Sequence, residues 1–502
     1  MRKKKKLVLL LLCLTAALLF SGCASPQKLF LENDKTFAGL GPDEQEEAYD
    51  YRFFFQPEPY GFMVGYVGDT MPYYEDGTYY IYYLKEGGGS FNHSVYLTAT
   101  KDFLTYTEYE DPVLEANYEG GQDGWIGTGS VVKVGDDYDF FYTAHASSGN
   151  FEYKEKIMVA RGSSPAAAFD KVEGWELIPP EELGQKNDFR DPQAYYDEES
   201  GKIILTVTAA QDGVARILKF TLSPDLSEAV YDGIIFTDPT GDFWNLECSD
   251  TFCMDGTCYL TYSGQDDTLW YAVSDDRYGP YSEPRRIDGK IFYAAKHVEN
   301  GENVYMAGWA RRSESLRSVA PLTGWGGNLL VQQIGRNSDG SLYLEPVRSI
   351  ANTFSAKRPL LIKKDSFTMK AKDTRTYTEA FTAYERFMIT GKFNFTDNGI
   401  FGLAFDFEGS PEDYKLIVFD PEADKLELRF GSGATLITET AAALEAGQTY
   451  SFTYLQEGSV GVFYIDGHAA LTVRLYGVSG KPIRLFAENN SISFTDLKEF
   501  TD

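Results

Sequence analysis

Val67-Gly-Asp-Thr-Met-Pro-Tyr-Tyr-Glu-Asp-Gly-Thr-Tyr-Tyr-Ile-Tyr-Tyr-Leu84 carries the clearest structural signal in the sequence. Its second half has the chemistry of a β-hairpin, because aromatic and β-branched residues flank Asp76-Gly77. Asp-Gly accepts the positive φ angles of a two-residue turn. Asp69 stands seven residues before Asp76. The stretch therefore predicts two antiparallel strands with a carboxylate at the head of the first.

The same layout of strand, turn and strand recurs four more times along the chain. Successive turns are about 45 to 60 residues apart, which suits one four-stranded propeller blade per repeat. The spacing predicts an all-β protein with a five-bladed β-propeller over residues 51–350. An ordinary β-sandwich meander is the alternative. The further copies span residues 131–143, 193–207, 251–262 and 293–309.

Three of the five copies carry an acid at the head of the first strand. Asp191 lies six residues before the turn residue Asp197, and Glu247 lies eight before Asp255. In a propeller the first strands line the central axis, so residues at the same point of different blades converge at one end. The register thus predicts that Asp69, Asp191 and Glu247 meet in one cavity.

The composition limits the kinds of partner. The chain has 502 residues, with 35 Tyr, 35 Phe and 47 Gly, and a formal net charge of −29. Removal of residues 1–23 takes away five basic side chains, so the charge becomes 41 − 75 = −34. Such a body repels nucleic acid and anionic membrane and favours a neutral substrate. A solvated acidic surface is the simpler explanation of most of this charge. The sequence leaves the oligomeric state open.

Cysteine usage after the leader is sparse, with Cys248, Cys253 and Cys258. Their spacing is neither that of a disulfide framework nor that of a metal site. Across a turn at Asp255-Gly256, Cys253 and Cys258 would face each other. A cross-strand disulfide and two free thiols are both compatible with this pattern.

Residues 1–23 have the character of a targeting segment. A basic stretch from Arg2 to Lys6 precedes an apolar core that is too short to span a bilayer. The core ends in Leu19-Phe20-Ser21-Gly22-Cys23, which resembles the bacterial lipobox, with Phe20 in place of the usual Leu. The resemblance implies cleavage before Cys23, its lipidation, and display outside the cytoplasmic membrane with the lipid as the only membrane contact. Ordinary secretion is the alternative, and residues 24–50 are predicted to be a polar tether.

The residues beside the acids suit acid–base catalysis. Arg190 next to Asp191 would keep that acid ionised and could bind a substrate hydroxyl. Glu247 follows Trp244 and Leu246, and poorly polar surroundings raise the pKa of a carboxyl, as suits a general acid.

These motifs fall in the order seen in glycoside hydrolase family 32, the β-fructosidases that include invertases, levanases and inulinases. The resemblance rests on Asp69 before its hairpin, Thr128-Gly129-Ser130, Arg190-Asp191-Pro192, Glu247-Cys248, and Asp288 with Tyr293-Ala-Ala-Lys296. It implies that Asp69 is the nucleophile, Asp191 the carboxylate that stabilises the transition state, and Glu247 the acid/base. It also assigns substrate binding to Arg190, Thr128, Asp288, Tyr293 and Lys296.

The sequence departs from the family pattern at the first motif. The family's usual Asn-Asp-Pro-Asn-Gly is here Gly68-Asp69-Thr70-Met71-Pro72, so the Asn before the nucleophile is missing. A Gln that is common after the first hairpin is also replaced, by Leu84 or Lys85. The acids are kept while the sugar-binding shell is altered.

The activity implied by the resemblance is hydrolysis of levan, inulin or related fructosides with retention of configuration, without a metal or organic cofactor. It implies carboxyl groups of Asp69 and Glu247 about 5 to 6 Å apart, whereas about 9 Å would indicate an inverting hydrolase of the arabinanase and xylosidase type. A surface lipoprotein that binds fructan without cleaving it is the alternative from another class.

Residues 360–502 show a different pattern, of alternating strands at sandwich spacing. This part resembles the lectin-like β-sandwich that follows the propeller in the same family, with residues 351–359 as the linker. Glycan binding and packing against the propeller are both open as its role.

Overall fold

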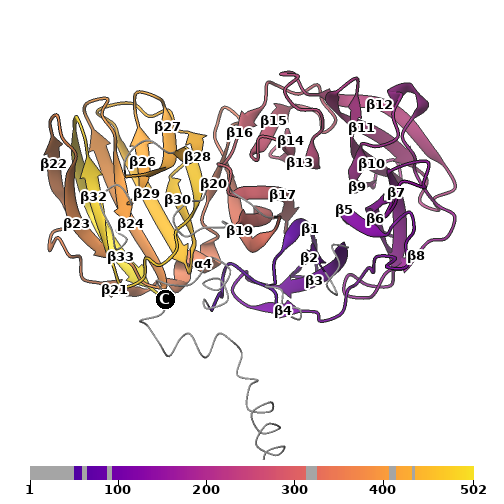
Figure 1. The fold of residues 1–502 in the computed structure, drawn as a ribbon, viewed down its shortest axis with the longest axis horizontal. Coiled ribbons are helices and arrows are strands. Elements are labelled where there is room, and N and C mark those ends of the chain that lie inside the picture. The colour runs from indigo at the N-terminus through magenta and orange to yellow at the C-terminus, as the bar shows by residue number, and fades with distance from the viewer. Residues whose placement is uncertain (1–49, 59–64, 87–92, 313–324, 406–413, 432–435) are drawn as a thin grey trace, which may run out of the picture.

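Four-stranded antiparallel sheets form a ring in one half of the molecule, and a β-sandwich forms the other half in this computed structural model (Figure 1). The structure describes residues 50–58, 65–86, 93–312, 325–405, 414–431 and 436–502. The predicted leader, Cys23 and nearly all of the predicted tether lie outside these ranges. Among the described residues, no helix has the length and apolar character needed to cross a bilayer.

Each of the five repeats found in the sequence becomes one sheet of the ring, and each sheet follows chain order. The described strands of the five sheets are β1 (Gly68–Glu75), β2 (Thr78–Glu86), β3 (His93–Thr100) and β4 (Tyr106–Glu108); β5 (Trp125–Val134), β6 (Asp137–His145), β7 (Glu155–Gly162) and β8 (Asp170–Lys171); β9 (Phe189–Asp197), β10 (Lys202–Gln211), β11 (Val214–Leu222) and β12 (Ala229–Thr237); β13 (Glu247–Met254), β14 (Thr257–Ser263), β15 (Leu269–Ser274) and β16 (Arg285–Arg286); and β17 (Phe292–Glu299), β18 (Val304–Arg311), β19 (Gly327–Arg336) and β20 (Leu342–Glu345).

The first strands of the sheets surround the axis of the ring. Strands β1, β5, β9, β13 and β17 contact one another in this cyclic order, and β17 contacts β1 again. The chain before β1 joins the last sheet to the first, because the Val67 N–H donates to the Gly327 carbonyl over 2.8 Å and the Leu329 N–H to the Phe55 carbonyl over 2.8 Å. This layout is consistent with the predicted propeller.

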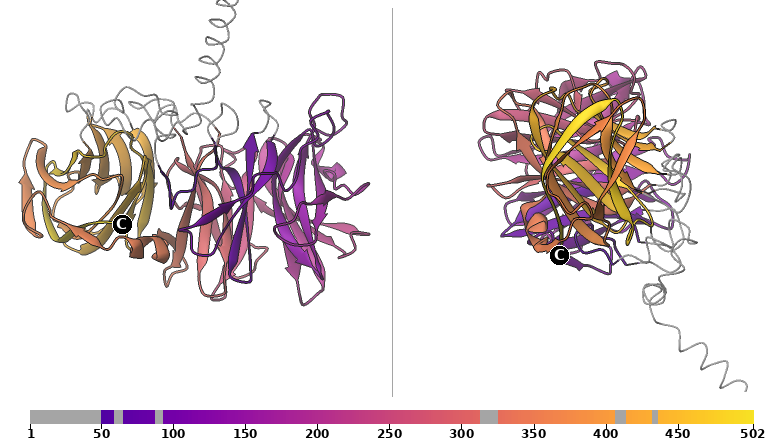
Figure 2. Two further views of the ribbon diagram at one scale, coloured as in Figure 1. Left: turned by 90° about the horizontal axis from the view of Figure 1, so that it is seen from below. Right: turned by 90° about the vertical axis from the view of Figure 1, so that its left-hand side faces the viewer.

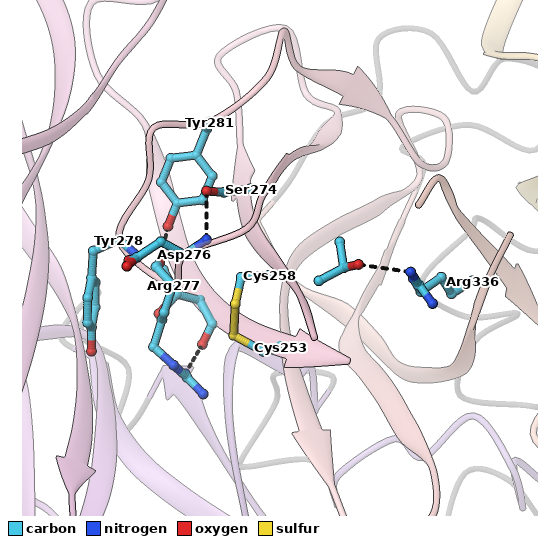
Figure 3. The surroundings of a disulfide bond; sticks show 10 residues. Cys253, Cys258, Ser274, Asp276, Arg277, Tyr278, Tyr281 and Arg336 are labelled. Atoms are coloured by element: carbon cyan, nitrogen blue, oxygen red, sulfur yellow. Dashed lines mark hydrogen bonds between the residues drawn. A yellow bond between two sulfur atoms is a disulfide. The ribbon is translucent and has the colours of Figure 1, made fainter. Parts of the chain in front are cut away.

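The predicted hairpin turns are confirmed by their backbone angles. Asp76 and Gly77 have φ values of 48° and 78°, and Asp255 and Gly256 have 48° and 80°. Both turns therefore use the left-handed region that Asp-Gly accepts at low cost. The second turn brings Cys253 and Cys258 into direct cross-strand register, where they form a disulfide (Figure 3). Cys248 is a buried free thiol.

The C-terminal half is a two-layered sandwich that packs beside the ring (Figure 2). Within the described ranges, one layer contains seven strands, β21 (Ala356–Arg358), β22 (Phe367–Ala371), β24 (Arg386–Phe395), β29 (Thr449–Glu457), β30 (Val460–Ile465), β31 (Ala469–Arg474) and β33 (Asn490–Thr501). The described residues of the other layer form six strands, β23 (Thr376–Thr382), β25 (Phe401–Phe405), β26 (Lys415–Asp420), β27 (Lys425–Phe430), β28 (Leu436–Ala441) and β32 (Pro482–Ala487). The predicted linker includes the end of helix α4 (Arg348–Thr353) and the whole of strand β21, so regular structure continues into it.

Buried polar contacts join the two halves. The guanidinium of Arg474 is fully buried and donates to the carbonyls of Ala310 and Arg311 at the end of β18, over 2.6 and 2.9 Å. Glu457 accepts hydrogen bonds from the backbone N–H groups of residues 52–54. Buried charges are tolerated only where they are paired or hydrogen-bonded, so these contacts fix the two halves against each other.

Candidate active site

The first strands share an irregularity at the position of the predicted site residues. The pairing register with the second strand shifts between Gly68 and Thr70 in β1, between Glu247 and Asp250 in β13, and opposite Asp191 in β9. Asp191 and Cys248 have positive φ values of 57° and 52°. A β-bulge redirects a side chain out of the pleat, and non-glycine residues with positive φ gather at functional sites. These bulges turn the acidic side chains towards the axis.

Asp69 is held by donors from two other sheets. Thr128 Oγ1 of β5 donates to Asp69 Oδ2 over 3.0 Å, and Trp309 Nε1 of β18 donates to Asp69 Oδ1 over 3.2 Å. Each carboxylate oxygen thus has a partner that fixes its direction. Trp309 is almost fully buried, so the indole that holds Asp69 cannot move freely.

Asp191 is the most buried of the three acids, with 4% of its surface exposed. Its Oδ2 accepts a hydrogen bond of 2.8 Å from the Cys248 N–H. Burial raises the pKa of Asp191 to about 7, against the lowering effect of the Arg190 cation, and the negative charges of Glu247 and Asp69 add to the rise. Its protonation is therefore coupled to that of the other two acids. The expectation that Arg190 keeps Asp191 ionised is corrected, because burial raises the pKa of Asp191 by more than the Arg190 cation lowers it.

Glu247 lies between a tyrosine and an arginine. Its Oε2 accepts a hydrogen bond of 2.7 Å from the Tyr293 hydroxyl, and its Oε1 lies 3.6 Å from Nη2 of Arg190. Burial raises the pKa of Glu247 above its ordinary value, while the Arg190 cation and the Tyr293 hydrogen bond oppose the rise. A carboxyl that stays protonated to higher pH is suited to act as a general acid.

Arg190 is the cation that links the acids to a buried network. Its Nη1 lies 3.1 Å from Glu155 Oε1 at the head of β7, and Glu155 Oε1 lies 3.3 Å from Nδ1 of His145 at the end of β6. Burial disfavours a charge on Glu155, but the hydrogen bond from His145 and the Arg190 cation lower the pKa of Glu155 below its ordinary value. Glu155, His145 and Trp309 were not predicted from the sequence, because no repeat register marks them.

The three acids open into a cavity of about 180 Å³. Its walls combine carboxylates, one guanidinium, histidines and tryptophans, as is usual for a site that orients a polar ligand by a few groups. The lining residues are Asp69, Leu84, His93, Trp125, Ile126, Gly127, Thr128, Thr143, His145, Glu155, Arg190, Asp191, Glu247 and Trp325. In the described part of the chain, no group of three or more His, Cys, Asp or Glu side chains could hold a metal ion.

Of the four remaining predicted substrate-binding residues, only Thr128 is among those that line the cavity. Thr128 lines the cavity and Tyr293 supports Glu247 from behind. Lys296 is buried in the ring, where its Nζ donates to the Gly129 carbonyl over 3.0 Å. Asp288 is not part of the cavity: it is fully buried against the sandwich and accepts hydrogen bonds from the Thr472 N–H and hydroxyl. This placement corrects the expectation that Asp288 binds substrate. Strand β17, which follows Asp288, belongs to the ring, whereas the Asp288 side chain contacts the sandwich.

The position of Trp325 explains why the first motif has Gly68 in place of the family's Asn. A Cβ atom at position 68 would lie 2.0 Å from Cζ2 of Trp325. Trp325 lines the cavity, and its indole stacks on His93 at 4.1 Å between ring centroids. An aromatic wall therefore occupies the space in which the family's Asn side chain would lie.

We expect Gly68→Asn to lower kcat/KM by about tenfold or more, because it forces Trp325 out of its place and overpacking costs about 1 to 3 kcal/mol. Steady-state kinetics of sugar release measure the effect. Trp325→Ala in the same chain should restore part of the loss by making room. Gly149→Asn is the matched control, since Gly149 is exposed, has open space around it and does not line the cavity. Full activity in the Gly68→Asn enzyme would show that this packing does not shape the site.

Comparison with known proteins places the chain in a family. A model of the N-terminal domain of glycosyl hydrolases family 32 matches residues 64–346, more than half of the chain. The chain belongs to glycoside hydrolase family 32. It is therefore a glycoside hydrolase, as the motifs predicted. A comparison with curated proteins finds no match.

Solved structures share the fold of this family 32 enzyme over nearly its whole length. The exo-inulinase from Aspergillus awamori has a TM-score of 0.71 at 15% identity, covering 90% of this chain and 98% of its own. The sucrose-6-phosphate hydrolase from Lactobacillus gasseri has 0.69 at 17%, covering 96% and 97%. The fructan 1-exohydrolase IIa from Cichorium intybus has 0.69 at 16%, covering 90% and 97%. At such low identity these likenesses show the fold alone.

Proposed function

We propose that this family 32 enzyme is a retaining hydrolase of fructosyl-containing oligo- or polysaccharides, such as levan, inulin or related fructosides. The observation that carries the proposal is the gathering of Asp69, Asp191 and Glu247 on one cavity with Arg190 between them. We treat the five sheets as the five blades of one propeller whose axial end holds this cavity. A protein that only binds sugar has no need of several carboxylates whose burial is costly.

The proposed mechanism is double displacement. Asp69 attacks the anomeric carbon while Glu247 gives its proton to the leaving oxygen, so the glycosidic bond breaks and a glycosyl-enzyme ester forms. Glu247, now a carboxylate, takes a proton from water, and the water oxygen displaces Asp69 from the same carbon. The Tyr293 hydroxyl and the Arg190 cation keep the Glu247 carboxyl in place during both steps. Asp191 would hold neighbouring hydroxyls and balance the positive charge of the oxocarbenium-like transition state.

The location of the enzyme is a further part of the proposal. The lipobox-like sequence before Cys23 supports export and attachment to the outer side of the cytoplasmic membrane by a lipid on that cysteine. The acidic body would then face a neutral polysaccharide outside the cell.

The stereochemistry of the product tests the proposed reaction. We expect the purified enzyme to release fructose from at least one of levan, inulin and sucrose, and NMR spectra recorded during the first turnovers to show the anomer of the substrate. The reason is that two successive displacements at one carbon restore its configuration. An inverted first product would contradict the role of Asp69 as nucleophile, and release of arabinose from arabinofuranosides in place of fructose would contradict the substrate class.

A further inference from the structure

Two tryptophans at the edge of the cavity are exposed although they are large and apolar. Trp125 has 38% and Trp244 has 48% of its surface exposed. Trp125 begins β5 and lines the cavity. Trp244 stands three residues before Glu247, and its ring lies over the Arg190 guanidinium at 5.5 Å. Exposed aromatic surface beside a polar cavity is a mark of ligand binding.

A continuous series of side-chain contacts holds the rings of both tryptophans in place. The Trp125 ring stacks on His145 with 5.6 Å between centroids and 19° between planes. His145 Nδ1 lies 3.3 Å from Glu155 Oε1, and the same oxygen lies 3.1 Å from Arg190 Nη1. The contacts therefore run without a break from Trp125 through His145, Glu155 and Arg190 to Trp244.

The strand register explains why these groups meet. Trp125 is paired with His145 across β5 and β6, and His145 is paired with Glu155 across β6 and β7. Three neighbouring strands thus place these side chains at one end of the second sheet. Glu155 has only 2% of its surface exposed, so its carboxylate is a fixed point against which His145 and Arg190 are oriented.

We propose that Trp125 and Trp244 are stacking platforms that bind the sugar units of a chain beyond the bond that is cleaved. Trp244 packs on Arg190, whose Nη2 lies 3.6 Å from Oε1 of Glu247. Because Glu247 gives its proton to the leaving oxygen, we place this platform on the leaving-group side. The C–H face of a sugar ring is apolar and packs on an aromatic face. Rings that are already held in place lose little conformational freedom on binding. The inference rests on the proposed function and adds to it the residues that bind the sugar units beyond the cleaved bond.

The experiment is a kinetic series with fructo-oligosaccharides of increasing length, starting from the disaccharide. One set has the linkage of inulin and the other has the linkage of levan. We expect Trp125→Ala and Trp244→Ala to raise KM for the longer substrates by about tenfold, with kcat within about twofold, and to raise KM for the disaccharide less, because it has a single sugar unit beyond the cleaved bond. Phe at either position keeps a flat ring and should recover most of the affinity. Because both side chains are exposed, the variants should unfold at the wild-type temperature.

Tyr195 provides the matched control. It is an exposed aromatic residue, 40% exposed, that lies under the guanidinium of Arg277 at 4.1 Å and does not line the cavity. Tyr195→Ala should leave the kinetics of every substrate unchanged. An equal rise in KM for short and long substrates, or no rise for either, would overturn the platform role. Fructose release by the wild type would still support the proposed function in that case. A wild-type enzyme that released fructose from no member of the series would overturn both.

Discussion

Replacement of Asp69 by Asn is expected to lower kcat by roughly 10,000-fold or more, the scale on which enzymes lose activity without their nucleophile. An amide has the size of the carboxylate but cannot form the glycosyl ester. Binding should change little, since the amide oxygen can still accept a hydrogen bond from Thr128 or Trp309. The loss should therefore appear in kcat while KM stays near the wild-type value. Sugar release from the best substrate of the wild type is the measurement.

The matched control for this variant is Asp76→Asn. It makes the same chemical change in the same hairpin, and Asn-Gly forms the two-residue turn as well as Asp-Gly does. Its kcat should stay within about twofold of the wild type. An Asp69→Asn enzyme that kept more than about a tenth of the wild-type kcat would remove Asp69 from the role of nucleophile.

Replacement of Glu247 by Gln is expected to lower kcat/KM by about 100- to 10,000-fold, the usual contribution of general acid catalysis. The loss should be smaller for a substrate whose leaving group departs without a proton, such as an aryl fructoside. Azide, which attacks the glycosyl-enzyme without a base, should accelerate the variant. Glu75→Gln, at the far end of β1 beside Lys133, is the control with the same chemical change.

The pH dependence of the activity tests the role of Glu247 in a second way. Glu247 must be protonated to act first, and burial raises its pKa. Activity of the wild type should therefore persist above the ordinary range of a glutamic acid and fall as pH rises through the raised value. Arg190 lowers that pKa, so an Arg190→Ala enzyme should lose activity at a higher pH than the wild type does. A profile with the same alkaline limb in the Glu247→Gln enzyme would contradict this assignment.

The sequence was sufficient to predict the local geometry of the repeats. Asp76-Gly77 and Asp255-Gly256 demanded positive φ angles. The turn residues Asp76, Asp197 and Asp255 each follow an acid by six to eight positions, and this similar spacing placed Asp69, Asp191 and Glu247 at the same point of three sheets. These inferences rest on short-range chemistry, in which a residue type and a spacing of six to eight positions decide the outcome.

Partners from distant parts of the chain could not be predicted in the same way. Trp309 reaches Asp69 across 240 positions, and Glu155 holds Arg190 through packing between neighbouring sheets. The bulges that turn the acids towards the axis depend on the pairing of two strands, which composition does not reveal. The prediction that Asp288 binds substrate failed for a related reason. It rested on a motif resemblance, which does not reveal that Asp288 contacts Thr472 of the sandwich.

Mass spectrometry of the Glu247→Gln enzyme after brief reaction with an aryl fructoside tests whether Asp69 is the nucleophile. Without its base, the variant should accumulate the glycosyl-enzyme. We expect a peptide containing Asp69 that is heavier by one fructosyl residue, and no such adduct in the Asp69→Asn, Glu247→Gln double variant. An adduct on a different carboxylate, or product formation with no adduct at any time, would contradict that role of Asp69.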